Sequence, residues 1–551
     1  MAGSSKVAAG GGDRLSDLPD GILEHVLSFL PAADAVRSSV LSRRWLRAWA
    51  HAPALNLSDE HLQDRFLGFA RELLARYGAP DVPALNVTLG CESSLGPAAA
   101  AWLRGAMERA VESISVTVTT PGTMHQLTLP RGMRAKSMTL RLSGVPFKHG
   151  PLVLPDPGAP TSFGALTELS LSRVRLQENV RPLGEFLSSC CPGLRKLRLT
   201  KVSGGLVADG GLQLWPLVLH LDMLEELVVD RVESFNKLQV VSASLRVLGV
   251  HSCFESLSQW GIDTVVEISA PRLDVVGWSG SLPKHISFEN GSHCIRWLSG
   301  ICFYLPGRES QSASAVRLLE MCSVANYLSV YIDIPDSTTP SMLTQEELDH
   351  VPQLPNIRVL SLELVAILRF ISCPIAPIIF SFIRRCTNLT WLHIDLSMLH
   401  QFSRFNRAYL MVPDNNDTEV KKPCQSSDCN PWKACRDQLE LGSLREIRIS
   451  GFMGTDREME LAHVLFGVGV ERPALERISI SLFPHLRQGM DGSPVCSAGA
   501  TSPAFKRMSL PFPQLLQHMD SIADKMKAQF PLVEGYWETI PRKELTWSRT
   551  C

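Results

Sequence analysis

The sequence predicts an α/β protein in which a short helical segment precedes a solenoid of repeated strands. Two observations predict this fold. Residues 13–50 carry apolar side chains at the three- and four-residue spacing of amphipathic helices. From about residue 115, an L-x-x-L-x-L pattern recurs at intervals of about 21–32 residues, which is typical of stacked structural repeats. A chain of 551 residues is long enough for such an array and a separate N-terminal domain.

The N-terminal segment is predicted to form three short helices. Pro19 can start the first helix, because its missing N–H is not needed there, and Pro31 ends it. The apolar face of this helix consists of Ile22, Leu23, Val26, Leu27 and Leu30. A second helix is expected from about Ala32, and a third over residues 39–49.

The predicted third helix presents Val40, Leu41, Trp45 and Trp49 on one side. Three short helices cannot bury this much apolar surface by themselves. The segment should therefore dock on the rest of the chain or on a partner. The periodicity of the segment favours neither docking on the rest of the chain nor docking on a partner.

The stretch LSDLPDGILEHVLSFLPAADAVRSSVLSRRWLRAWAHAPALNLSD resembles the F-box of plant F-box proteins. The resemblance rests on the Leu18-Pro19 start, the LSFLP break and the VLSRRW run. It implies that the apolar face binds a Skp-family adaptor and, through it, a cullin ubiquitin ligase. The expected docking residues, some of which must instead pack the helices together, are Leu18, Pro19, Ile22, Leu23, Val26, Leu27, Leu30, Val40, Leu41 and Trp45.

Composition argues against several functional classes. Apolar residues make up 45% and charged residues 20% of the chain, and a formal net charge of −1 gives no general attraction for nucleic acid or anionic membrane. The 14 cysteines are scattered and the N-terminus lacks an apolar signal region, so we expect free thiols and a location in the cytoplasm and/or nucleus. Residues 364–383 could span a bilayer in length, but Arg369, Pro374 and Pro377 favour two shorter buried elements.

The segments around the repeats have distinct expected roles. Residues 1–12 are predicted to be a disordered tail, and 13–57 the F-box. Residues 58–114 are predicted to be a helical linker and cap, with helices near 59–77 and 98–111 that fasten the F-box to the repeats.

The repeats are expected over residues 115–400, and residues 401–440 are a polar stretch expected to form an exposed loop. The clearest repeated strands are LTELSLSRV at 166–174, LRKLRLTKV at 194–202, LEELVVDRV at 224–232, LRVLGVHSC at 245–253, LDVVGW at 273–278, IRVLSLEL at 357–364 and LTWLHIDL at 389–396. Degenerate copies are expected near 124–130 and 136–145, and a weak strand near 330–332.

Alternation within each repeat separates core from surface. Leu169 and Leu171 should point into the core, whereas Glu168 and Ser170 should face outward, as should Arg198 and Glu226 in later repeats. Helical material such as 182–189 is expected between strands. The pattern resembles a leucine-rich-repeat solenoid, which implies an irregular right-handed α/β horseshoe. A doubly wound α/β domain would need fewer and longer strands.

The C-terminal part also carries a resemblance. Residues 424–483 are similar to the FBD region of plant F-box/leucine-rich-repeat proteins, through Pro431-Trp432, Gly451-Phe452 and a predicted helix over 456–466. Residues 441–490 are interpreted as FBD-like terminal repeats. Residues 491–551 are interpreted as a partly ordered tail with one helix near 515–530.

Catalytic, cofactor and metal motifs were not found in the sequence. There is no phosphate-binding loop and no nucleophile elbow. Cys424, Cys429 and Cys435 are too widely spaced for a typical zinc site and lack an evident fourth ligand. The other conspicuous residues, interpreted as ordinary repeat positions, are His251, Cys253, Trp278, Trp391 and His393.

The F-box resemblance implies a non-catalytic, substrate-recognition subunit of an SCF-type ubiquitin ligase. Its repeats would bind an unidentified target protein, with no cofactor, metal, nucleic acid or membrane. One alternative is a non-degradative binding or scaffold protein, or a sensor of a small ligand. An enzyme acting by itself is the third hypothesis, for which the sequence offers no catalytic constellation.

Overall fold

The computed structural model describes most of the chain in two compact units, Met1–Arg272 and Leu273–Cys551. The residues that it describes are 18–90, 96–120, 126–144, 148–155, 162–176, 182–204, 214, 216–233, 236–254, 262–304, 309–334, 351–366, 375–396, 441–452, 454, 456–466, 474–481, 522, 524–528, 530, 535–540 and 544–549. The predicted tail 1–12 and loop 401–440 lie outside these residues.

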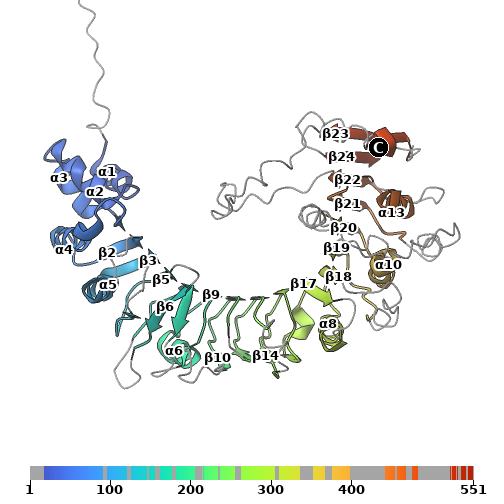
Figure 1. The fold of residues 1–551 in the computed structure, drawn as a ribbon, viewed down its shortest axis with the longest axis horizontal. Helices are drawn as coiled ribbons and strands as arrows, with labels where there is room; N and C mark the ends of the chain where they lie inside the picture. The colour runs from blue at the N-terminus through green and yellow to red at the C-terminus, as the bar shows by residue number, and fades with distance from the viewer. Residues whose placement is uncertain are drawn as a thin grey trace, which may run out of the picture. The chain divides into compact units, whose positions relative to one another are not determined.

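The first unit begins with short helices (Figure 1). They are α1 (Asp20–Leu27), α2 (Ala32–Arg37), η1 (Ser38–Val40), α3 (Trp45–Ala48) and η2 (Trp49–His51). The prolines precede α1 and α2 as predicted.

The prediction of one continuous third helix over 39–49 is wrong, because the chain leaves helical geometry between η1 and α3. The Ser42 hydroxyl accepts a hydrogen bond from the Trp45 N–H at 3.4 Å, a bond that competes with continuation of a helix. Val40 and Trp49 therefore do not share a face. Val40 is 86% exposed, whereas Trp49 is buried.

A sheet of parallel strands forms the body of the first unit. Each strand pairs in parallel with the next, in the order β1 (Ala54–Ser58), β2 (Val82–Leu89), β3 (Ala110–Thr120), β5 (Ser137–Gly144), β7 (Glu168–Ser172), β9 (Lys196–Thr200), β11 (Glu226–Asp230) and β13 (Val247–His251). The inward positions are buried as predicted, with Leu169 at 3% and Leu171 at 2% exposure.

The parallel sheet starts earlier than the repeat pattern indicated. Strand β1 begins at Ala54, inside the range assigned to the F-box, and β2 lies inside the expected helical linker. The helices expected near 59–77 and 98–111 are present as α4 (Phe66–Arg76) and α5 (Pro97–Arg109). Each of the first two strands shows only a short apolar alternation and no full L-x-x-L-x-L pattern, which is why sequence reasoning missed them.

A second layer of strands replaces most of the helices expected between repeats in this unit. Helix α6 (Leu183–Cys190) follows the prediction. Elsewhere the connections contain further parallel strands, namely β4 (Leu127–Thr128), β6 (Lys148–Val153) and β8 (Val174–Leu176), and β10 (Pro216–His220), β12 (Lys237–Val241) and β14 (Val265–Ser269). Residues 231–246, which connect β11 to β13, accommodate one five-residue strand with its turns, whereas a helix of several turns with its own connections takes more residues.

The second unit continues the same construction with helices between its strands. Its parallel strands are β15 (Val275–Ser279), β17 (Trp297–Tyr304), β18 (Tyr327–Ile334), β19 (Val359–Ala366), β20 (Trp391–Asp395), β21 (Glu446–Ser450) and β22 (Arg477–Ser481). A further strand, β16 (His285–Glu289), lies outside this series. Helices α8 (Glu309–Met321), α10 (Ile375–Arg385) and α13 (Asp456–Phe466) lie on one side of these strands in Figure 1.

Three expectations for this unit are confirmed. The weak strand near 330–332 belongs to β18, and α13 has the predicted bounds. Residues 364–383 divide between the end of β19 and α10. Within the described part of the chain, no helix has both the length and the apolarity that a membrane crossing requires.

A C-terminal hairpin that sequence reasoning missed completes the second unit. Strands β23 (Gly535–Ile540) and β24 (Glu544–Arg549) pair antiparallel, and β24 pairs antiparallel with β22. Leu545 and Trp547 are buried. Strand β24 therefore supplies partners for backbone groups that β22 would otherwise leave open at the edge of the sheet.

Among the described glycines, Gly300 is the position at which the backbone tolerates a side chain least. Its φ is +75°, and a Cβ atom would lie 1.9 Å from the Trp278 carbonyl oxygen of the neighbouring strand. The pairing of β17 with β18 shifts register at the same place, between Leu298 and Ile301. We expect Gly300→Ala to lower the free energy of unfolding by more than about 2 kcal/mol, as measured by urea denaturation.

Gly442→Ala is the matched control for this prediction. Gly442 lies in an exposed turn, and a Cβ atom there would meet nothing within 4 Å. Its free energy of unfolding should change by less than about 1 kcal/mol. Equal stability of the two variants would contradict the close approach of β17 to β15.

Candidate functional site

The N-terminal helices of residues 18–52 have a small apolar interior. Leu23 and Leu27 of α1 are 0% and 1% exposed, and Ala48, Trp49 and Ala52 are buried as well. Leu27 and Trp49 line one small internal cavity together with residues of the first strand. Leu23 and Leu27 belong to the predicted docking set, some members of which were expected to pack the helices together, and the structure places these two in the interior on which the helices pack.

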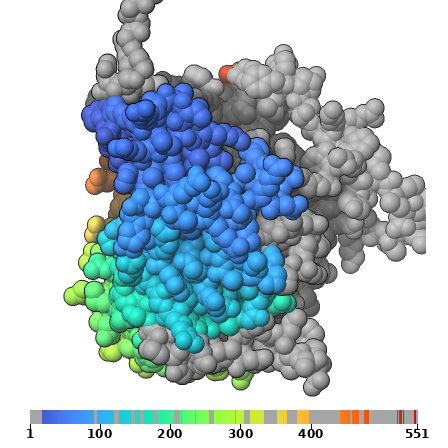
Figure 2. All heavy atoms as spheres, turned by 90° about the vertical axis from the view of Figure 1, so that its left-hand side faces the viewer, coloured from blue at the N-terminus to red at the C-terminus, as the bar shows by residue number. Residues whose placement is uncertain are grey.

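The other apolar members of the predicted set lie on the surface. Ile22 is 47% exposed, Val26 42%, Leu30 37%, Val40 86% and Leu41 65%. Pro19 is exposed, and Leu18 and Trp45 are half-buried. Figure 2 draws the outer surface of this segment in dark blue.

Two further exposed residues extend this surface, and sequence reasoning did not select them. Phe29 is 72% and Leu46 is 55% exposed. Among the described residues, 10 large apolar side chains are exposed, and 7 of them lie between Ile22 and Leu46. Such a concentration of exposed apolar side chains is typical of a protein-binding surface. We call these seven residues the apolar docking surface: Ile22, Val26, Phe29, Leu30, Val40, Leu41 and Leu46.

Arg44 holds the two halves of the apolar docking surface together. Its Nε donates to the Asp20 carboxylate at 2.5 Å, and its Nη2 donates to the Leu18 carbonyl oxygen. The start of α1 and the loop before α3 are thereby joined across 24 residues of sequence. The exposed side chains of α1 consequently belong to the same small domain surface as Val40 and Leu41.

Polar contacts attach this domain to the parallel sheet. Asn56 of β1 donates from Nδ2 to the carbonyl oxygens of Ser28 at 2.7 Å and Leu30 at 3.0 Å. Its own Oδ1 accepts a bond from Asn86 Nδ2 of β2 at 2.8 Å. The Tyr77 hydroxyl, whose pKa is raised mainly by burial, donates to the Ala52 carbonyl oxygen at 2.8 Å. The helices are therefore mounted on the sheet by directional bonds as well as by apolar contact.

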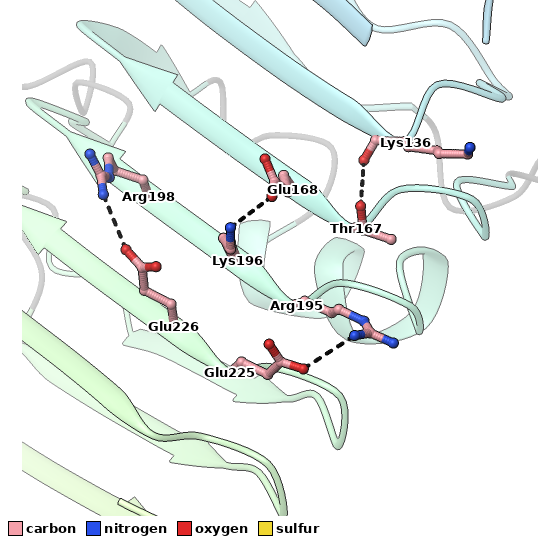
Figure 3. Close-up of polar contacts among 8 residues, drawn as sticks. All are labelled: Lys136, Thr167, Glu168, Arg195, Lys196, Arg198, Glu225 and Glu226. Carbon is pink, nitrogen blue, oxygen red and sulfur yellow. Dashed lines mark hydrogen bonds and ion pairs between the residues drawn. The ribbon is translucent and has the colours of Figure 1, made fainter. Parts of the chain in front are cut away.

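The outer face of the first unit's sheet carries a ladder of ion pairs (Figure 3). Lys196 pairs with Glu168 at 2.9 Å, and Arg198 pairs with Glu226 at 3.1 Å, each pair bridging adjacent strands. Three of these residues, Glu168, Arg198 and Glu226, were predicted to face outward, which the structure confirms. Exposed ion pairs add little stability, so the ladder chiefly neutralises this part of the face.

The outer face of the second unit is more apolar. Trp297 of β17 stacks on Tyr327 of β18, with ring centroids 3.5 Å apart and an interplanar angle of 10°. Val359 of β19 pairs in register with Tyr327, and Trp391 of β20 pairs in register with Val359, so these residues lie side by side on the same face. Trp391 is half-buried on this face, whereas Trp278 is 1% exposed and belongs to the core, as predicted for a repeat residue.

His393 is held between two hydroxyl groups. Its Nδ1 lies 3.0 Å from Ser361 Oγ, and its Nε2 lies 2.9 Å from Ser450 Oγ. Burial lowers the pKa of the imidazole, with a smaller lowering by Arg448 opposed by Asp395. Ser361 is only 5% exposed, so a substrate has little access to its hydroxyl. The arrangement serves to orient the ring and join three strands.

The other conspicuous residues also occupy structural positions. Burial raises the pKa of the Cys253 thiol to about 12, which keeps it protonated and unreactive. The described cysteines are free, in accordance with the sequence prediction. Within the described ranges, no group of three His, Cys, Asp or Glu side chains is arranged to hold a metal ion, and Cys424, Cys429 and Cys435 lie outside those ranges.

Comparison with known proteins adds independent information. The F-box domain model matches residues 15–53, which end immediately before β1. A putative F-box/LRR-repeat protein of Arabidopsis thaliana is 35% identical over 108 residues, which are 20% of this chain and 22% of that protein. An F-box/FBD/LRR-repeat protein of the same plant is 28% identical over 325 residues, covering 57% of this chain and 66% of its own length. A second F-box/FBD/LRR-repeat protein is 26% identical over 207 residues, 36% of this chain and 43% of its own length.

The environment of His393 predicts a pH dependence of stability. Because the pKa of His393 is lowered in the folded chain, the unfolded chain binds more protons once the pH falls below the ordinary histidine value of about 6.5. Stability should therefore be retained above about pH 6.5 and fall as the medium becomes more acidic. His393→Gln removes this contribution, and its melting temperature should fall less between about pH 7 and pH 5.

His293→Gln provides the control, because His293 is exposed near β17. This variant should show the same pH dependence as the unaltered chain in thermal melts. Identical pH profiles for His393→Gln and the unaltered chain would contradict a buried neutral imidazole at position 393.

Proposed function

We propose that this chain, which carries an F-box domain at residues 15–53 and is similar to F-box/FBD/LRR-repeat proteins of Arabidopsis thaliana, is a substrate-recognition adaptor subunit of an SCF-type ubiquitin ligase. The observation that supports this proposal most is the apolar docking surface. Seven exposed apolar residues gather on a small helical domain whose own interior is already filled by Leu23, Leu27 and Trp49.

The energetics favour a protein partner for this surface. Burying one aliphatic side chain fully contributes about 1.5–3 kcal/mol. Val40 and Leu41, the two most exposed aliphatic members, would supply much of the binding free energy on contact with a Skp-family adaptor. The bonds from Asn56 hold the domain on the sheet, so the adaptor and the repeat face would be joined by a firm connection.

In this proposal the chain accelerates ubiquitin transfer by proximity. The F-box would bind the adaptor and, through it, the cullin, while the repeats hold the target protein near the ubiquitin donor carried by other subunits. The chain makes and breaks no covalent bond in this mechanism. Such a role belongs to the cytoplasm and/or nucleus.

Val40→Asp tests the proposal without disturbing the fold, because Val40 is 86% exposed. A carboxylate at the centre of an apolar interface is costly to desolvate, so the affinity for a Skp-family adaptor should fall at least about tenfold. The measurement is co-purification of the full chain with the adaptor, followed by titration. The melting temperature of the free chain should not change.

The matched control is Val324→Asp, since Val324 is a 40% exposed aliphatic residue in the second unit. It should bind the adaptor as well as the unaltered chain does. If the unaltered chain does not bind the adaptor, the ligase role is wrong and the alternative of a non-degradative repeat protein takes its place. Adaptor binding that is equal in the two variants would remove the apolar docking surface from the interface.

The structure also shows which changes are unsuitable for this test. A charge at Leu27 is unsuitable, because Leu27 is 1% exposed and a buried charge there would unfold the helical domain. Deletion of residues 1–57 would remove most of β1 and leave β2 as a new edge. Point changes on the surface separate binding from folding, whereas these two changes do not.

A further inference from the structure

Basic residues follow three neighbouring strands of the first unit. Arg173, Lys201 and Arg231 come directly after β7, β9 and β11. The last residues of these strands pair in register, so the three basic residues lie side by side. Their backbone N–H groups confirm the alignment: Arg173 donates to the Thr200 carbonyl oxygen at 2.9 Å, and Lys201 donates to that of Asp230 at 2.7 Å.

Each of the three adopts a left-handed backbone conformation. The φ angles are +55° at Arg173, +52° at Lys201 and +50° at Arg231. Glycine or asparagine would occupy this conformation at lower cost than arginine or lysine. The turn after β13 has the same conformation at Ser252, with φ of +48°, so the conformation belongs to the repeated turn. What distinguishes β7, β9 and β11 is that a cation occupies this position after each of them.

Among the described residues, cations outnumber carboxylates at this edge. Those whose charge affects Lys201 are the cations Arg173, Arg231 and Arg141 and the carboxylate of Asp230. That carboxylate already binds the Arg231 guanidinium through both oxygens, at 3.0 and 2.9 Å. Burial, followed by the cations Arg173 and Arg231, lowers the pKa of Lys201.

The ion-pair ladder on the same strands makes a clear contrast. Lys196 and Arg198 each have a carboxylate partner on an adjacent strand (Figure 3). Arg173 instead donates to the Ser143 hydroxyl at 3.4 Å. Lys196 and Arg198, both within β9, are thus paired with carboxylates, whereas Arg173 and Lys201 lie side by side at the ends of their strands. Arg141 of β5 is in register with the last residue of β7 and adds a further positive charge there.

We propose that Arg141, Arg173, Lys201 and Arg231, here named the cationic row, bind an acidic segment of the target protein. This inference rests on the proposed function, because it names the chemistry by which the repeats recognise their target. Neighbouring strands are about 4.8 Å apart, so cations on successive strands can meet the carboxylates of a short extended acidic segment that crosses the strands.

The surroundings favour a protein segment over nucleic acid. Lys196, Arg195 and Arg198 on the same sheet are already paired with carboxylates, so the ladder offers little free positive charge along which a long polyanion could extend. The formal net charge of −1 likewise gives no general attraction for nucleic acid. A short acidic segment can contact the cationic row without covering the ladder.

The test is fluorescence anisotropy of a labelled oligoglutamate peptide titrated with the full chain. The double variant Arg173→Asn/Lys201→Asn removes two charges and retains a residue that accepts the left-handed conformation. We expect the variant to bind about tenfold more weakly, because two surface ion pairs are lost. Added salt should weaken binding of the unaltered chain more than binding of the variant.

The matched control is Lys196→Gln/Arg198→Gln, which also removes two cations from this face, but cations that are already paired. It should bind the peptide more tightly than Arg173→Asn/Lys201→Asn does, because it leaves the cationic row intact and the carboxylates that it frees repel the peptide only from a distance. The proposal is overturned if the unaltered chain does not bind the peptide, if both double variants lose affinity equally, or if a single-stranded oligonucleotide of the same charge binds more tightly.

Adaptor co-purification of Arg173→Asn/Lys201→Asn separates this inference from the proposed function. The apolar docking surface is untouched in this variant, so adaptor binding should persist whatever the peptide result is. Peptide binding without adaptor binding would leave the cationic row valid and remove the ligase role. Adaptor binding without peptide binding would leave the ligase role valid and remove the cationic row.

Discussion

The in-register pairing of parallel strands is the constraint on which the structure depends. No strand of five to eight residues can cover its own apolar side, so each inward residue is buried by its counterparts on the neighbouring strands. In the first unit this produces an unbroken inner row in which each residue is at most 3% exposed: Leu55, Leu85, Ile114, Met138, Leu169, Leu197, Leu227 and Leu248. A shift of one residue on any strand would expose this row, because alternate residues point to opposite faces.

The docking surface depends on the first member of that row of strands. Asn56 alternates with the buried Leu55 and Leu57, so the register that buries the leucines also turns the Asn56 amide towards the helical domain. The bond from Asn86 repeats the arrangement on the next strand. The apolar docking surface is therefore positioned by the same strand register that builds the core. A local change in β1 would disturb both the core and the docking surface.

Register also brings together outward residues that are distant in sequence. The ion-pair ladder joins residues about 30 positions apart, and the stack of Trp297 on Tyr327 does the same in the second unit. Where opposite charges meet, the face is neutral. Where like charges meet, as at Arg173 and Lys201, their mutual repulsion costs folding free energy that a bound anion would reduce. The cationic row is understood here as such a site.

The sequence by itself determined the α/β class, the repeating strands, the presence of an F-box and the bounds of α13, because each depends on local periodicity or on a contiguous motif. It could not distinguish Leu27 from Val40, since both belong to apolar patterns and only packing buries one and exposes the other. Pairing with distant partners likewise decides where the remaining strands form: the early strands β1 and β2, the second layer of strands, and the hairpin of β23 and β24. The cationic row exists only in three dimensions, because strand pairing, and not sequence spacing, places Arg173, Lys201 and Arg231 side by side.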